Sequence, residues 1–233
     1  MQRHRGRTDN HGMHRSRLAT PVLMVLLAII PIHSGAAMVR APARESRRSG
    51  TPDPTPLVAI QPMGVVDPAL SRCVGARIAR LFVVDVVVLP VRPLPESAWY
   101  RPRMRYRGGP LVEWLADEKP PPVAALLGLM SRDLSSTKGH IYDWGVMGIG
   151  SPTRATGVVS TYRLGGHHAS DSLVTRRACQ VALHELGHAF GLAHCRTPRC
   201  IMNDAEGLIG SVDRSTGEYC SLCRRKLDGL LRD

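Results

Sequence analysis

The 233-residue chain is poor in aromatic side chains and in lysine. Phe, Trp and Tyr make up 4% of the residues, and lysine occurs only at positions 119, 138 and 226, so that arginine carries most of the formal net charge of +12. The arginines are scattered, few aromatic rings could stack on bases, and no nucleic-acid motif is visible. We therefore expect no nucleic-acid partner, although a basic surface would suit contact with an anionic cell envelope.

A long apolar run is also missing. The longest runs from Leu18 to Ile32, fifteen residues, whereas a helix that crosses a membrane needs about 20. Five arginines precede this run and the small residues Ser34 to Ala37 follow it, which is the order of basic region, apolar region and cleavage site in a secretory signal. We expect residues 1–37 to be a signal peptide and the protein to be exported to the periplasm or the extracellular space. An uncleaved N-terminal membrane anchor is the alternative.

The rest of the chain divides into a linker and one domain. Residues 38–56 lack apolar periodicity and are rich in arginine and proline, which predicts a disordered linker. Residues 57–233 are enough for a single domain with its own core, and we expect a monomer. Apolar patterns predict strands at 57–60, 82–89, 124–130, 144–149 and 158–162, and helices at 68–81, 109–117 and 172–190.

The stretch from His184 to His194 carries the chemistry. His184 and His188 lie one turn apart on a helix, so both rings can reach one zinc ion at about 2.0–2.1 Å. Gly191 can end the helix in a left-handed conformation and bring His194 back as a third ligand. Three histidines leave one corner of a tetrahedral site for water, and Glu185 is placed to accept its proton. This pattern predicts a catalytic zinc site.

Four cysteines follow this motif and end in a C-x-x-C pair: Cys195, Cys200, Cys220 and Cys223. Four thiols with such spacing predict a closed structural zinc site. Because export would bring them into an oxidising compartment, two disulfides are the alternative. The remaining pair, Cys73 and Cys179, has no metal-ligand spacing, and each is either a small buried residue or half of a further disulfide.

Together these residues give the pattern HExxHxxGxxHC, four residues, CxM, seventeen residues, CxxC, in which the chain resembles the archaemetzincin family of metallopeptidases. The resemblance covers residues 57–230 and implies an α+β, metzincin-like zincin fold: a mixed β-sheet, an active-site helix and a small C-terminal zinc-bearing subdomain. It implies two zinc ions per chain, with Met202 as an apolar floor beneath the catalytic one. It further implies that a strand near 144–149 forms the edge that pairs with an extended peptide.

We therefore expect an exported zinc metallopeptidase that acts on peptide or protein substrates, with Glu185 as general base. Two alternatives stay open: a non-catalytic zinc-binding interaction protein and a zinc amidase that acts on cell-wall peptides. His140, His167 and His168 lie in loop-like surroundings without paired spacing, and we expect them to be exposed and without a role in the site.

Overall fold

A computed structural model describes residues 37–42, 55–165 and 169–231. A six-stranded mixed sheet, in the order β1-β3-β2-β6-β10-β9, forms the centre of the domain. The four inner strands run parallel to one another, and the two edge strands are antiparallel to their neighbours. In that order the strands are Ala37–Val39, Asp85–Val88, Leu57–Met63, Ala125–Met130, Thr156–Ser160 and Gly148–Ser151.

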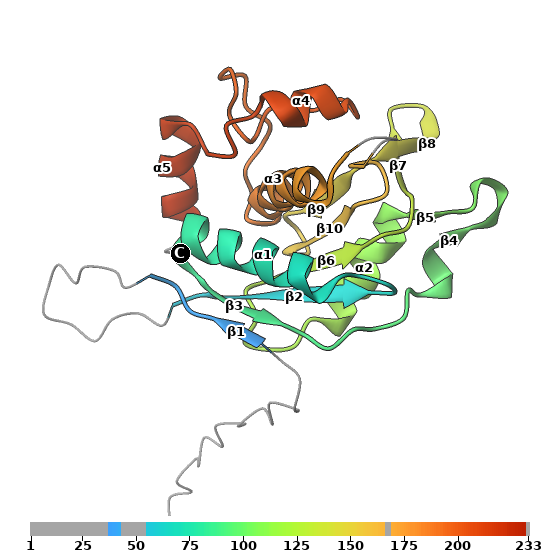
Figure 1. Ribbon diagram of the computed structural model, residues 1–233, viewed down its shortest axis with the longest axis horizontal. Helices are drawn as coiled ribbons and strands as arrows, with labels where there is room; N and C mark the ends of the chain where they lie inside the picture. Colours follow the sequence, from blue (N-terminus) through green and yellow to red (C-terminus); the bar gives the residue numbers. More distant parts are fainter. Residues whose placement is uncertain (1–36, 43–54, 166–168, 232–233) are drawn as a thin grey trace, which may run out of the picture. The chain divides into compact units, whose positions relative to one another are not determined.

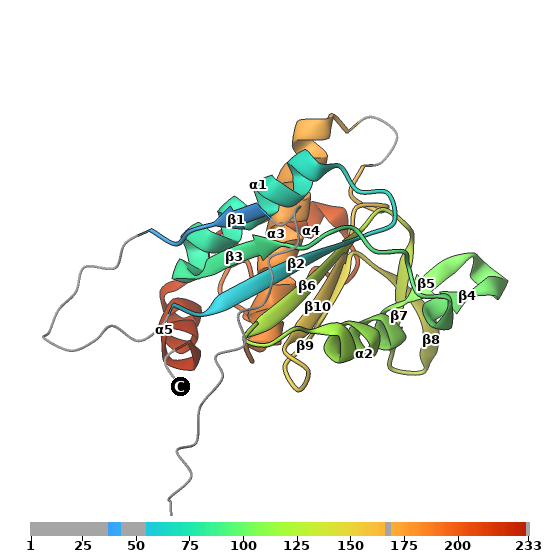
Figure 2. The ribbon, with the colours of Figure 1, turned by 90° about the horizontal axis from the view of Figure 1, so that it is seen from below.

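Helices cover both faces of this sheet (Figures 1 and 2). On one face lie α1 (Pro68–Ile78), which continues as the π-helical turn η1 (Ala79–Val83), and α3 (Asp171–Ala189). The opposite face carries α2 (Gly108–Glu118). Alternate residues of the inner strands enter the two hydrophobic cores; Val58 and Ile60, for example, join the α1 and α3 side, whereas Ala59 joins the α2 side. The result is a three-layer α+β domain.

A second, four-stranded sheet has the order β4-β5-β7-β8. Its strands are Trp99–Tyr100, Arg105–Arg107, Leu134–Lys138 and Ile141–Val146, and two short 3₁₀ helices, η2 (Glu96–Ala98) and η3 (Arg101–Arg103), flank β4. The chain ends in α4 (Ile209–Arg214) and α5 (Ser221–Leu230), which follow α3. In Figure 1, α4 lies above α3, and α5 lies beside α3 on the side away from the second sheet.

Two strand predictions need correction. The strand expected over 82–89 begins only at Asp85, because Phe82 is buried in the π-helical turn and Val83 has a φ of 57°, which breaks extended structure. The strand expected over 144–149 is in fact two: β8 ends at Val146 in the small sheet, and β9 begins at Gly148 as an edge of the large one.

The N-terminal part differs from expectation at its boundary. Ala37, expected as the last residue of the signal peptide, and residues 38 and 39, expected at the start of a linker, form β1. This strand pairs with the valines of β3 and places Val39 against the core. Asp85 accepts a hydrogen bond from the Ala41 backbone N–H at 2.8 Å and holds the strand end. The rest of the expected signal and linker, 1–36 and 43–54, lies outside the described residues. Among the helices that are described, none is long and apolar enough to cross a membrane.

Candidate metal centre and substrate cleft

Helix α3 brings the first site residues together, and its bounds match the prediction closely. Ser170 caps the helix by accepting a hydrogen bond from the Leu173 backbone N–H at 3.3 Å. At the other end Gly191 adopts a φ of 99°, and the backbone N–H groups of residues 191 and 192 donate to the carbonyls of His188 and Gly187. This left-handed end is what turns the chain toward His194.

The three predicted histidines meet at one point. Their ring nitrogens lie within 4.8 Å of one another. The ring centroids of His184 and His188 are 4.6 Å apart, and that of His194 lies 4.7 Å from His188 and 5.3 Å from His184. His184 and His188 are partly buried, whereas the side chain of His194 is 48% exposed. Two ligand candidates are therefore held rigidly by α3 and the third by the following loop.

The hydrogen bonds of the two helical histidines leave lone pairs facing each other. The Nδ1 atom of His184 lies 2.7 Å from the Ile201 carbonyl, and that of His188 lies 2.7 Å from the Leu192 carbonyl. A carbonyl oxygen only accepts, so each Nδ1 carries the hydrogen and each Nε2 an unshared pair. The two Nε2 atoms are 3.0 Å apart. Burial lowers the pKa of His184 to about 4 and lowers that of His188. Both rings are therefore neutral at pH 7, and no hydrogen lies between the two Nε2 atoms. A cation fits this donor set.

Glu185 lies beside the histidines and is almost completely buried, with 7% of its surface exposed. Its carboxylate packs under β9 so closely that a Cβ added to Gly148 would lie 2.6 Å from Oε1. Burial raises the pKa of Glu185 to about 8, with a smaller contribution from the Asp204 carboxylate. A cation at the three imidazoles would oppose this rise, because it favours the ionised form of a neighbouring carboxylate.

A cleft of about 310 Å³ opens over these groups. Gly148 and Ile149 of β9 line it together with His184, Glu185 and His194. Because β9 is the last strand of the large sheet, its outer backbone edge has no strand partner in the described part of the chain. Most of the predicted 144–149 stretch does line the cleft, through Trp144 and 146–149. Of these residues only Gly148 and Ile149 belong to β9.

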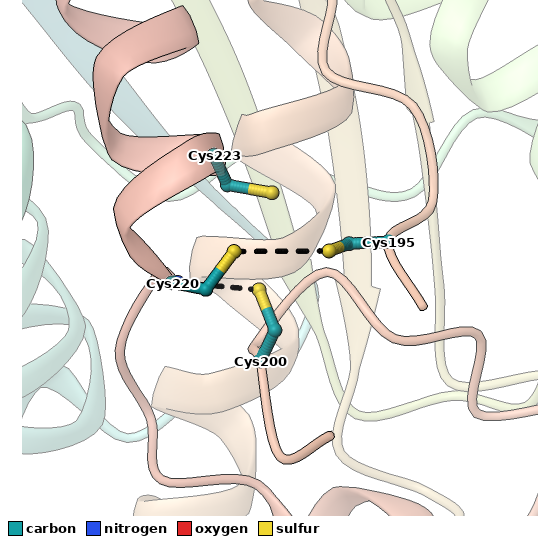
Figure 3. A group of neighbouring side chains, drawn as sticks. All are labelled: Cys195, Cys200, Cys220 and Cys223. Carbon is teal, nitrogen blue, oxygen red and sulfur yellow. Dashed lines mark hydrogen bonds between the residues drawn. The ribbon is translucent and has the colours of Figure 1, made fainter. Parts of the chain in front are cut away.

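Four cysteine sulfurs gather beside α3, as Figure 3 shows, and lie within 4.8 Å of one another. The Sγ atoms of Cys195 and Cys220 are 3.8 Å apart. Four sulfurs placed tetrahedrally at the usual Zn–S distance of about 2.3 Å would be about 3.8 Å apart, whereas a disulfide bond is about 2.0 Å long. Backbone N–H groups donate to these sulfurs, Thr197 to Cys195 and Cys220 to Cys200, each at 3.4 Å. The geometry fits a cation held by thiolates.

The acidity of Cys220 agrees with this. Its pKa is lowered to about 6, chiefly by a hydrogen bond from the Cys223 backbone N–H, so the thiolate that a metal requires forms readily. Burial raises the pKa of Cys223 and of Cys200, and these two thiols would gain most from the charge of a metal ion.

Met202 and Tyr219 both contact helix α3 close to the histidines. Met202 is fully buried, and its sulfur would lie 2.7 Å from a Cβ added to Gly187, on the zinc-site helix between the two histidines. The Met202 carbonyl also accepts a hydrogen bond from the Cys195 backbone N–H at 2.8 Å. This bond joins the segment around Met202 to the loop that carries His194. The Tyr219 hydroxyl donates to the Leu183 carbonyl at 2.6 Å.

Sequence reasoning missed two features of the site. Asp204 lies in the cleft with Oδ2 3.7 Å from Nδ1 of His194, and a single aspartate in a loop carries no recognisable spacing. The close contact of Gly148 and Gly150 with α3 was also missed, although the G-x-G spacing was visible. Of the three histidines set aside, His140 is exposed as expected, and 167 and 168 lie outside the described residues.

Comparison with known proteins agrees with the geometry. The sequence profile of peptidase family M54 matches residues 111–229. The archaemetzincin of Pyrococcus abyssi is 35% identical over 111 residues, 45% of this chain and 55% of that protein. The archaemetzincin of Thermococcus kodakarensis is 31% identical over 138 residues, 56% of this chain and 70% of that protein. The matched stretch thus spans only about half the length of the Pyrococcus relative.

Solved structures cover more of the chain. The crystal structure of archaemetzincin from Archaeoglobus fulgidus, complexed with malonate, superposes with a TM-score of 0.61 at 26% identity over 73% of this chain and 99% of that one. Archaemetzincin from Methanopyrus kandleri gives a TM-score of 0.64 at 26% identity over 77% and 97%. The motif, the fold and these matches show that the chain belongs to peptidase family M54, the archaemetzincins.

Proposed function

We propose that this protein is a zinc-dependent metallopeptidase that hydrolyses peptide bonds in the cleft beside β9. The observation that carries the proposal is that three imidazoles meet beside a buried carboxylate, and that two of them, His184 and His194, line one cleft with Glu185. His184, His188 and His194 would bind the catalytic zinc. Zinc, when bound, supplies Lewis-acid polarisation of the substrate carbonyl and makes water more acidic.

Glu185 would do the proton chemistry. Its carboxylate accepts a proton from the attacking water as general base and then passes that proton to the leaving amine. The tight packing of Gly148 over its side chain supports this role, because it holds the carboxylate in one position. Since water is largely excluded from a side chain that is 7% exposed, the proton stays within the site during the reaction.

Strand β9 would position the substrate. An extended peptide can add to its open edge through backbone hydrogen bonds, as peptides add to sheet edges elsewhere. Gly148 and Ile149 line the cleft directly above Glu185, so a peptide paired there would pass its backbone over the three histidines. Peptides and proteins with an extended segment are the proposed substrates.

The four-cysteine cluster would bind a second, structural zinc. Support comes from the sulfur spacing and from the N–H groups that donate to the sulfurs. Cys195 directly follows His194, so the two metal centres would share a peptide bond and the second zinc would steady the third catalytic ligand.

Residues 1–37 would direct the protein out of the cytoplasm, which fractionation of cells expressing the full chain can test.

A diverse peptide library tests the activity. We expect the zinc-loaded full-length protein to cut peptide bonds that remain intact with Glu185→Gln, with cut positions read by mass spectrometry. Cuts at N-terminal bonds or internal bonds would distinguish aminopeptidase from endopeptidase action. An intact library together with release of fragments from isolated cell wall would instead identify an amidase. No hydrolysis of either substrate by a protein shown to hold zinc would contradict the proposal.

A further inference from the structure

Helices α1 and α3 carry a second pair of cysteines, apart from the four-sulfur cluster. Cys73 of α1 and Cys179 of α3 are 106 residues apart in sequence, yet their Sγ atoms lie 4.0 Å from each other. The two helices pack together on the same face of the large sheet. At this separation the sulfurs are near van der Waals contact, and a shift of about 2 Å would bring them to the bonding distance of about 2.0 Å.

This pair is not part of a metal site in the described residues. Groups of three or more metal-ligating atoms occur there only at the three histidines and at the other four cysteines. All six cysteines of the chain are free thiols in the structure. Because the four-sulfur cluster accounts for the C-x-x-C signature, Cys73 and Cys179 need a separate explanation.

The two thiols differ in access to solvent. Cys73 is exposed, whereas Cys179 is 8% exposed. Burial, with a further contribution from Cys73, raises the pKa of Cys179 to about 12, which makes it a poor first nucleophile. An oxidant in solution can therefore reach Cys73 but not readily its partner, and the order of reaction follows from this difference.

We propose that Cys73 and Cys179 are an oxidisable pair that forms a disulfide joining α1 to the zinc-site helix α3. The oxidant is a small disulfide such as oxidised glutathione. The Cys73 thiolate attacks one sulfur of the oxidant and releases one thiol, which leaves a mixed disulfide on Cys73. Cys179 then loses its proton and attacks the Cys73 sulfur, which releases a second thiol. Two protein thiols are oxidised and one external disulfide is reduced to two thiols.

The bond would act on the helix that carries the site. It closes a loop of 106 residues, and cross-links over loops of this length restrict the unfolded chain most strongly. Its anchor on α3, Cys179, lies near the middle of the helix, between the N-terminal cap and His184. The oxidised protein would hold α3 against α1 when the rest of the domain loosens, and the melting temperature should rise on the order of 10 °C.

The experiment treats the zinc-loaded full-length protein with oxidised glutathione, blocks the remaining thiols by alkylation and maps tryptic peptides. Trypsin separates the two cysteines into peptides 73–77 and 178–196. The second peptide also contains Cys195, and fragmentation distinguishes the two sites. Melting temperatures are compared before oxidation, after oxidation and after reduction. Cys73→Ser is the control, because the replaced side chain is exposed and its loss should not disturb the fold.

We expect a 73–179 cross-link, a melting temperature that rises on oxidation and falls on reduction, and no such rise in Cys73→Ser. Recovery of both residues as alkylated thiols, or of Cys73 as a stable glutathione adduct without the cross-link, would overturn the proposal. Zinc content is measured in the same samples and peptide cleavage is not, so the result does not depend on the proposed peptidase activity.

Discussion

The contact between β9 and α3 at Gly150 should control the geometry of the catalytic groups. A Cβ added at this position would lie 2.3 Å from the Glu185 carbonyl oxygen and 2.7 Å from the Cβ of His188. Both neighbours belong to the helix that carries the site, and the nearer atom is backbone, which cannot rotate away. Gly150→Ala therefore has to push the strand and the helix apart.

The size of the effect follows from this distance. Non-bonded atoms need about 3.4 Å or more, so the gap between β9 and α3 must widen by about 1 Å. A displacement of 1 Å between a catalytic group and the substrate can cost about 100-fold in rate. Overpacking of this kind also costs about 1–3 kcal/mol of stability, which for a domain of this size lowers the melting temperature by about 2–12 °C.

The assay compares kcat/KM for peptide cleavage, the zinc content and the melting temperature of wild type, Gly150→Ala and Gly109→Ala. The control is matched in chemistry, because a Cβ added to Gly109 meets no atom within 4 Å and lies at the start of α2, on the opposite face of the sheet. We expect Gly109→Ala to keep wild-type activity. Equal activity and equal melting temperature of the two variants would refute the argument that this contact positions the site.

Three further changes test other contacts. Tyr219→Phe removes the hydrogen bond to the buried Leu183 carbonyl and should lower the free energy of unfolding by about 1 kcal/mol, measured by urea denaturation; an unchanged value would show that this bond contributes nothing. Asp213→Asn removes the paired hydrogen bonds from Arg177. Because this pair is partly exposed, we expect the free energy of unfolding to fall by only about 1 kcal/mol at neutral pH. Arg177 lowers the pKa of Asp213 in the folded state, so this contribution exists above the unfolded aspartate pKa of about 3.9 and is lost as the pH falls through the lower folded value; a difference between the two proteins that persisted in strong acid would contradict it. Cys220→Ser should release the structural zinc and weaken catalytic zinc binding, read by competition titration with a chelator, and unchanged catalytic affinity would disprove the coupling of the two centres.

Local spacing allowed much of the site to be predicted. A helix fixes the relation of His184 to His188, and Gly191 allows the left-handed helix end that turns the chain back, so three ligand candidates follow from the sequence with little help from the rest of the fold. Helix α3 begins and ends within one residue of its predicted bounds because its cap and its terminal glycine are both local signals.

Features that depend on distant neighbours were not accessible in this way. The apolar pattern of Trp144–Ile149 predicts one strand, and only the pairing partners in the folded protein divide it between two sheets. Strand β7 was missed because Ser135, Ser136 and Thr137 give it no apolar alternation. The approach of Gly150 to α3 and the position of Asp204 in the cleft likewise depend on tertiary structure.

The most direct test of the central claim is the rate of peptide cleavage at saturating substrate by wild type and Glu185→Gln, compared at equal measured zinc content. The glutamine keeps the shape of the side chain but cannot accept the proton. We predict that the variant binds zinc like the wild type and that its turnover falls by about 100- to 10,000-fold. A variant with full zinc content that cleaves peptides at nearly the wild-type rate would contradict the assignment of Glu185 as the general base.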